Sequence, residues 1–129
     1  MVLTYRALYK TYPYACKAIV DFAHENRLLF EAALDEFLAS KGIIVESEGV
    51  HDRNRGNKLV GYSYKIGIKS VIGAIEPTII SDTTIFTRDI YAWQEGVRHA
   101  LRIIEAELNS QVSSGATVTM LGANSVGKN

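Results

Sequence analysis

Apolar residues recur at spacings of three and four between Tyr14 and Lys41, which predicts a helix with one buried face. These apolar positions are Ala15, Ile19, Phe22, Ala23, Phe30, Ala33, Leu34, Phe37 and Leu38. Pro13 suits the first turn, because its missing N–H would be unpaired there anyway, and Gly42 suits a left-handed helix stop. One continuous helix would be about 40 Å long. We therefore expect it either to break near His24–Arg27 or to extend beyond the domain into a partner.

A second helical pattern covers Arg88–Gln111. Its apolar stripe consists of Ile90, Trp93, Val97, Leu101, Ile104 and Leu108. Thr87 suits the N-cap position, and Asp89 suits the positive end of the helix dipole. Gly96 lies inside this helix and costs about 1 kcal/mol relative to Ala, so we expect another backbone to approach closely there.

Alternating polar and apolar residues mark Leu59–Lys69 as a strand with one buried face. Ile43–Val50 is a second strand. The connection between them, His51–Lys58, is polar and contains Asn and Gly, which accept positive φ. The sequence therefore predicts an antiparallel hairpin, in which two glutamates of the first strand come opposite Lys65 and its neighbours.

Three less regular segments complete the chain. Met1–Lys10 is rich in β-formers and predicts a short strand. Val71–Phe86 contains strand-like Ile and Phe residues between Gly and Pro, and predicts one or two short strands. Ala116–Leu121 alternates and predicts a strand within the tail. That tail strand would either close its own sheet or pair with a second copy of the chain.

These elements together predict an α+β domain with two long helices on one face of an antiparallel sheet. The order β-α-β-β-(β)-α-β is that of a ferredoxin-like sandwich. We expect one domain over 1–111 and a Gly/Ser-rich C-terminal tail over 112–129. The helices and the tail strand offer more apolar surface than one thin sandwich needs. We therefore expect a homo-oligomer, in the simplest case a dimer with two-fold symmetry.

Composition narrows the class of protein. The 129 residues are 47% hydrophobic and 22% charged, which is typical of one globular domain. Lys and Arg number 14 and Asp and Glu number 14, so the chain lacks the basic surface that holds duplex nucleic acid or anionic membranes. The single Cys excludes an internal disulfide and favours a reducing, cytoplasmic compartment. No apolar run is long enough to cross a membrane.

The sequence contains no complete motif for a cofactor, a metal ion or a catalytic group. Cys16 has no assigned partner base, so we interpret it as a core residue. The three His residues lack the spacing of a zinc site or a Ser-His-Asp triad. Gly122–Lys128 matches the start of a P-loop, but Asn129 stands where Ser or Thr would hold Mg²⁺. We therefore expect no phosphate site there, and an enzyme that uses Cys16 or a His stays open as an alternative.

One face of the second predicted helix points to an anionic ligand. The residues assigned to this site are Arg88, Arg98 and Arg102, with Phe86, Tyr91 and Trp93 as aromatic neighbours. Arg98 and Arg102 are one turn apart, and their repulsion is unfavourable unless another group offsets it. In one interpretation a ligand phosphate does so, while an aromatic ring stacks on a base. In the other, Glu95 and Glu105 neutralise the two arginines as surface ion pairs.

The predicted hairpin connection offers a second group of cations. Arg53 and Arg55 alternate there with Asn and Gly, and arginine forks with free backbone amides suit a phosphate or carboxylate. A solvated hairpin tip explains the same residues without a ligand.

The sequence favours a self-associating binding protein that holds or sequesters a small anionic, nucleotide-like ligand. Two alternatives stay open beside the small enzyme named above. One is a protein–protein interaction module that acts as an inhibitor or adaptor, and the other is an accessory protein of a phage or mobile element. A ligand binder needs a concave pocket of roughly 300 Å³ or more with converging polar groups. An adaptor needs an apolar patch with aromatic or Arg anchors.

Overall fold

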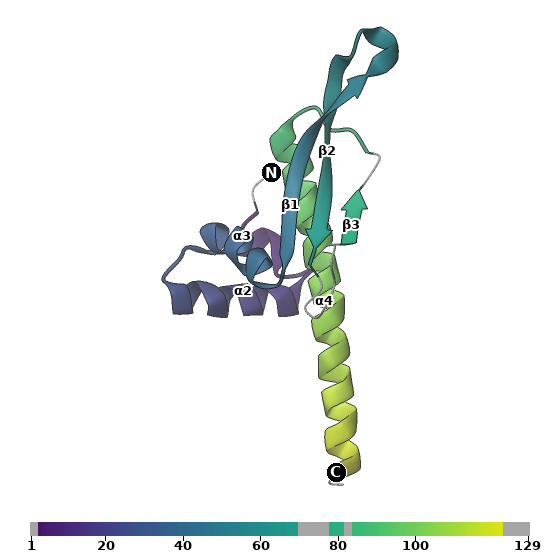
Figure 1. Ribbon diagram of the computed structural model, residues 1–129. Coiled ribbons are helices and arrows are strands. Elements are labelled where there is room, and N and C mark those ends of the chain that lie inside the picture. The colour runs from purple at the N-terminus through teal and green to yellow at the C-terminus, as the bar shows by residue number, and fades with distance from the viewer. Residues whose placement is uncertain (1–2, 70–77, 82–83, 123–129) are drawn as a thin grey trace.

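The computed structural model describes residues 3–69, 78–81 and 84–122, and for residues 113–122 it describes the backbone (Figure 1). The helices are α1 (Tyr5–Leu8), α2 (Pro13–Asn26), α3 (Phe30–Ser40) and α4 (Asp89–Gly122). The strands are β1 (Ile43–Asp52), β2 (Lys58–Ile68) and β3 (Thr78–Ser81), with a short 3-10 turn at Arg53–Arg55. The architecture is α+β, with an antiparallel sheet packed against helices.

The sheet has the order β1-β2-β3, and both neighbouring pairs are antiparallel. The β1–β2 hairpin is the one that the alternation predicts. Lys65 pairs across the strands with Glu46, and its Nζ lies 3.8 Å from Glu48 Oε1. The register shifts between Val50 and His51, where the hairpin continues toward its tip. In the segment Val71–Phe86 the description includes one strand, β3, while residues 71–77 and 82–83 lie outside it.

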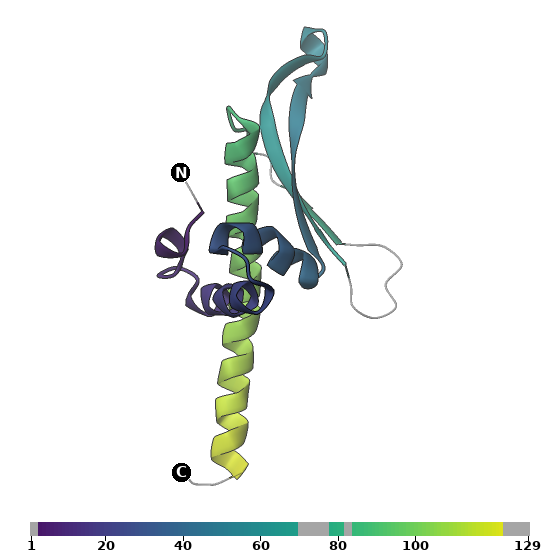
Figure 2. The same cartoon turned by 90° about the vertical axis from the view of Figure 1, so that its left-hand side faces the viewer.

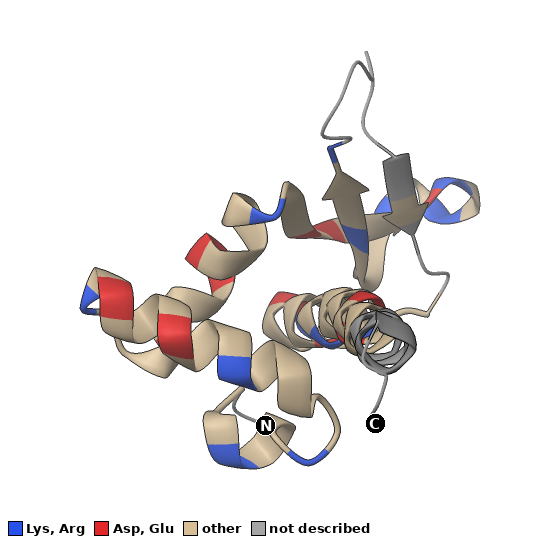
Figure 3. Cartoon of the chain, turned by 90° about the horizontal axis from the view of Figure 1, so that it is seen from below, with Lys and Arg blue, Asp and Glu red and all other residues tan. Residues whose placement is uncertain are grey.

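Helix α4 lies along one face of the sheet, and α2 and α3 pack near the end of the sheet where β1 begins (Figures 2 and 3). Gly96 is where α4 comes closest to the sheet. A Cβ at this position would lie 2.6 Å from Val45 Cγ1 and 3.1 Å from Tyr64 Cβ. The predicted close approach is therefore present, but side chains of the sheet cause it rather than a backbone.

The segment from Tyr14 to Lys41 forms two helices rather than one. The break falls at Arg27, which adopts a left-handed φ of 56° and whose N–H donates to the carbonyls of Ala23 and His24. Of the two expected outcomes, the break near His24–Arg27 is the one that occurs. Gly42 follows α3 with a φ of 77°, as predicted for a helix stop.

The core lies between the sheet, α4 and the α2–α3 pair. Its largest fully buried side chains are Tyr64, Leu8, Ile19, Leu34, Leu38, Ile66, Leu101, Val97 and Cys16. Every helix contributes to this set, and so does β2. Burying a side chain of Leu or Ile size stabilises the fold by about 1.5–3 kcal/mol, so this shared core holds the elements together.

The prediction of a strand at Met1–Lys10 is wrong. Residues Tyr5–Leu8 form α1, and Thr4 caps it by accepting a hydrogen bond from the Ala7 N–H at 3.2 Å. Tyr5 and Tyr9 stack one helical turn apart, with ring centroids 5.2 Å apart. Spacings of three and four, not of two, therefore organise this segment, and Leu8 is its buried anchor.

The prediction of a strand at Ala116–Leu121 is also wrong. Helix α4 continues without interruption to Gly122, and Figure 1 shows this part of it beyond the end of the sheet. Alternation raises strand preference only where a pairing edge is available, and no described strand lies beside this segment. The described order is therefore α-α-α-β-β-β-α, which lacks the first and last strands of the predicted ferredoxin-like order.

Candidate functional site

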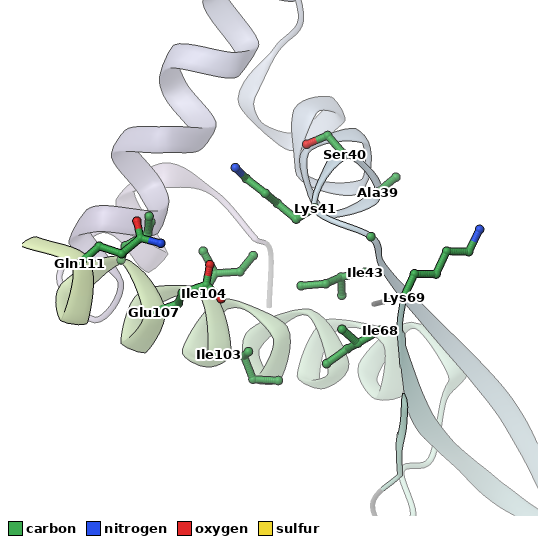
Figure 4. A pocket seen from close by; sticks show the side chains of 12 residues that line it. Ala39, Ser40, Lys41, Ile43, Ile68, Lys69, Ile103, Ile104, Glu107 and Gln111 are labelled. Carbon is green, nitrogen blue, oxygen red and sulfur yellow. The ribbon is translucent and has the colours of Figure 1, made fainter. Parts of the chain in front are cut away.

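A cavity of about 590 Å³ lies where the end of α3, the start of β1, the end of β2 and the middle of α4 meet (Figure 4). Its floor is apolar and consists of Ile43, Ile68, Ile103, Ile104 and Leu108. Its polar members include Lys41, Lys69, Glu107 and Gln111, all of which are exposed to solvent. The pocket therefore combines an aliphatic interior with a charged rim.

The turn after α3 fixes the two lysines at one end of this pocket. The Lys69 N–H donates to the Gly42 carbonyl at 2.8 Å, which joins the end of β2 to the turn before β1. A Cβ at Gly42 would lie 3.2 Å from the Lys69 carbonyl oxygen, and the φ of 77° also favours glycine there. Lys41 and Lys69 consequently leave neighbouring backbone positions and diverge (Figure 4).

The charges at the rim favour an anion. Two lysines and one glutamate line the pocket, so the local excess is positive although the whole chain is neutral. Lys41 Nζ lies 5.6 Å from the centre of the Phe37 ring, a cation–π contact that keeps the ammonium close to α3. Glu107 and Gln111 approach from α4 on the other side of the pocket (Figure 4).

The arginine face predicted on α4 exists, but it is separate from this pocket. Arg88, Tyr91 and Arg102 are exposed and Arg98 is partly buried. The Arg88 guanidinium carbon lies 6.0 Å from the centre of the Tyr91 ring. These side chains occupy the outer, convex side of a helix, while other positions of the same helix line the cavity.

Two of the predicted aromatic neighbours belong elsewhere. Trp93 stands nine residues before Arg102, two and a half turns of helix, which places it on the opposite side of α4, where it packs against the core. Phe86 is bound to the sheet, because its N–H donates to the Tyr62 carbonyl at 2.7 Å and its carbonyl accepts from the Tyr62 N–H at 2.9 Å. Tyr91 is the aromatic residue that shares the arginine face.

Arg53 and Arg55 lie at the hairpin tip, which extends past the beginning of α4 (Figures 1 and 2). Asp52 organises this tip: it accepts a hydrogen bond from the Asn54 N–H at 2.9 Å and pairs with Arg55 Nε at 3.6 Å. Gly56 and Asn57 both have positive φ. The contacts of the tip are local, which favours the interpretation as a solvated turn.

Glu105 has a role that the sequence pattern does not reveal. Its two carboxylate oxygens accept hydrogen bonds from the N–H groups of Tyr14 and Ala15, at 3.2 and 2.8 Å, and so cap the N-terminus of α2. An ion pair with Arg102 was the expectation for this residue. The absence of a side-chain cap at Tyr12 is the local signal that a distant acceptor is needed.

The same carboxylate bears on Cys16. The thiol is buried, and burial together with the Glu105 charge raises its pKa to about 11. A nucleophilic thiol needs the opposite shift, so Cys16 acts as a core residue in agreement with the sequence interpretation.

His99 is held by the sheet. Its Nδ1 lies 2.8 Å from the Tyr64 hydroxyl, and the two rings meet edge to face at 5.8 Å. Sequence reasoning missed this pair, because the two residues are far apart along the chain. His24 and His51 are exposed. Among the described residues, no group of three or more His, Cys, Asp or Glu side chains is arranged to hold a metal ion.

No protein-family model, curated protein or solved structure matches this chain. In the part of the chain that the structure describes, no helix is both long and apolar enough to span a membrane. Of the P-loop-like segment Gly122–Lys128, the structure describes the first residue alone. The chemistry of the candidate site is therefore argued from its own side chains.

Proposed function

We propose that this protein is a non-enzymatic binding protein that holds a small amphipathic anion between α3, β1, β2 and α4. The observation that carries the proposal is the cavity of about 590 Å³ with an isoleucine-rich floor and two lysines at its rim. This volume falls within the range of small-molecule sites, about 300–1,000 Å³. An aliphatic chain would contact the floor, and a carboxylate or phosphate would lie near the lysines.

The composition of the pocket refines the ligand class expected from the sequence. Its described lining contains no aromatic residue on which a base would stack. The aliphatic floor instead favours a ligand with a hydrocarbon body over a nucleotide. An enzyme is the less favoured alternative, because the raised pKa of Cys16 and the Tyr64 contact of His99 keep both groups in structural roles.

Isothermal titration of the wild-type protein with decanoate, decanol and AMP tests this proposal. We expect decanoate to bind more tightly than decanol, because only the carboxylate interacts with the lysines, and we expect AMP to bind weakly. Lys41→Ala and Lys69→Ala should each weaken decanoate binding about three- to tenfold. Lys58→Ala is the matched control, since Lys58 is an exposed lysine at the start of β2.

Two results would contradict the proposal. One is decanol binding as tightly as decanoate. The other is an equal effect of Lys58→Ala and Lys41→Ala, which would reveal a general charge effect rather than a site.

A protein–protein interaction module is the second candidate function. Its support is the group of large apolar side chains exposed near the hairpin and at the start of α4. These are Leu59, Val60, Ile85, Ile90 and Tyr91, each 42–51% exposed. Such residues are typical anchors of protein interfaces. The titrations separate the two candidates, because an interaction module binds none of the three small molecules.

A further inference from the structure

Helix α4 is much longer than the surface on which it packs. Its 34 residues correspond to about 51 Å of helix. Leu108 is the last of its residues packed against the core, and Gln111 is the last that lines the pocket. Residues 112–122 form an extension of about 16 Å, which projects beyond the rest of the described chain (Figures 1 and 2).

The composition of the extension does not suit a helix alone in water. Residues 108–122 include no charged side chain, whereas the first half of α4 has charges on most turns. Ser, Thr, Val and Gly, all weaker helix formers than Ala, make up most of residues 112–119. Because most helical stability comes from packing, an uncharged helix of this kind needs another surface against it.

The extension continues the pocket side of α4. Ile104, Leu108 and Gln111 line the pocket at spacings of four and three. The same alternation of spacings leads on to positions 115, 118 and 122, which are Gly, Val and Gly. One side of the helix is therefore pocket wall in its first half and an uncharged strip of small and apolar residues in its second.

We propose that a second copy of this chain binds with its α4 antiparallel to the first, crossing near Gln111, so that each extension forms a wall of the other copy's pocket. A two-fold axis at position 111 brings position 118 opposite position 104, and position 115 opposite position 107. A single symmetric contact thus covers both extensions and both pockets. Gly115 allows close approach beside Glu107, and the uncharged extension does not repel the lysines at the rim.

A second copy fits this surface better than an unrelated partner, because the two halves of one helix side are complementary. The interface itself is independent of the ligand. The wall that it provides rests on the proposed function, since a small ligand in a pocket needs most of its surface covered. The mouth of the pocket, where Lys41, Glu107 and Gln111 are exposed, is where that cover is missing.

Sedimentation of the full chain at tens of micromolar tests the interface. The wild type should sediment as a dimer of the 14.3 kDa chain. Val118→Glu should give a monomer, because it places a charge on the strip. Ala116→Glu adds the same charge two residues away, about 200° around the helix, and should stay dimeric. A monomeric wild type, or a dimeric Val118→Glu protein, would overturn the interface.

Cross-linking provides a measurement that does not depend on weakening the protein. Gln111→Cys places two thiols at the proposed two-fold axis, and oxidation with copper phenanthroline should join them in a disulfide. Asn109→Cys is the control, because position 109 lies on the other side of the helix. Equal cross-linking of the two variants would overturn the antiparallel arrangement.

Decanoate titrations then separate the wall from the ligand site. If the extension is a wall, Val118→Glu should weaken decanoate binding at least about tenfold, while Ala116→Glu leaves it unchanged. Loss of the dimer with unchanged affinity would overturn the wall and leave the proposed function intact. A dimeric wild type that binds no decanoate would overturn the proposed function and the wall together, and would leave the interface standing.

Discussion

At the scale of single residues, the stability of this protein depends on contacts between segments far apart in the sequence. Gly96 is necessary because Val45 and Tyr64 occupy the space where a side chain would lie. Glu105 is necessary because α2 begins without a cap of its own. Sequence reasoning identified the first as a point of close approach, because a glycine inside a helix is locally unfavourable. It missed the second, because no local pattern links residue 105 to residue 14.

Gly96→Ala should lower the free energy of unfolding by about 0.5–2 kcal/mol. Overpacking against Val45 costs about 1–3 kcal/mol, and the better helix propensity of Ala returns up to about 1 kcal/mol. Urea unfolding measures the difference. Val45→Ala removes the nearest atoms, so adding Gly96→Ala to Val45→Ala should cost less than adding it to the wild type. Equal costs in the two backgrounds would show that Val45 is not the constraint.

Cys16 should make stability depend on pH in the alkaline range. Its pKa is raised from 9.0 to about 11 by burial and by Glu105, so the folded state keeps the thiol proton that the unfolded state loses. The contribution is full below pH 9 and decreases as the pH rises toward 11. Chemical unfolding of wild type and Cys16→Ala between pH 8 and 11 isolates it. The wild type should lose stability faster, and parallel curves would contradict the assignment.

At the scale of elements, local patterns predicted what is locally determined. The β1–β2 hairpin follows from its alternation, and the stop at Gly42 follows from the φ that glycine accepts. The two wrong strands, at the N-terminus and in the tail, are both segments where alternation competes with helical spacing. In α1 the buried position of Leu8 and the Tyr5–Tyr9 stack decide for helix. The pocket was not predicted, because four separate elements form it.

The break between α2 and α3 gives a test at this scale. Arg27 holds a left-handed φ of 56°, which costs an L-residue roughly 1–2 kcal/mol. Arg27→Gly should therefore stabilise the protein by up to about 1 kcal/mol, after the greater freedom of glycine in the unfolded chain is subtracted. Asn26→Gly, one residue earlier and still helical, should destabilise it. Thermal unfolding of both variants checks the opposite signs.

At the scale of the whole molecule, the chain divides into a packed body and a projecting helix. The body contains the core, the sheet and the pocket floor. Exposed apolar surface and the end of a helix suggested self-association from the sequence, but the predicted device was a tail strand. The structure replaces that strand with a helical extension. The proposed contact between copies is accordingly helix against helix and pocket, rather than strand against strand.

Hydrogen exchange should reveal this division as a dependence on protein concentration. Isolated helices of this length are marginal in water, so the amides of residues 112–122 should exchange quickly in dilute protein, where the monomer predominates. At concentrations that favour the dimer, packing should slow them by the factor with which association stabilises the helix. Amides in the β1–β2 hairpin lie in the body and should exchange at the same rate in both conditions. Rapid exchange of the extension at every concentration would show that no second copy covers it, whereas slow exchange at every concentration would show that the helix needs none.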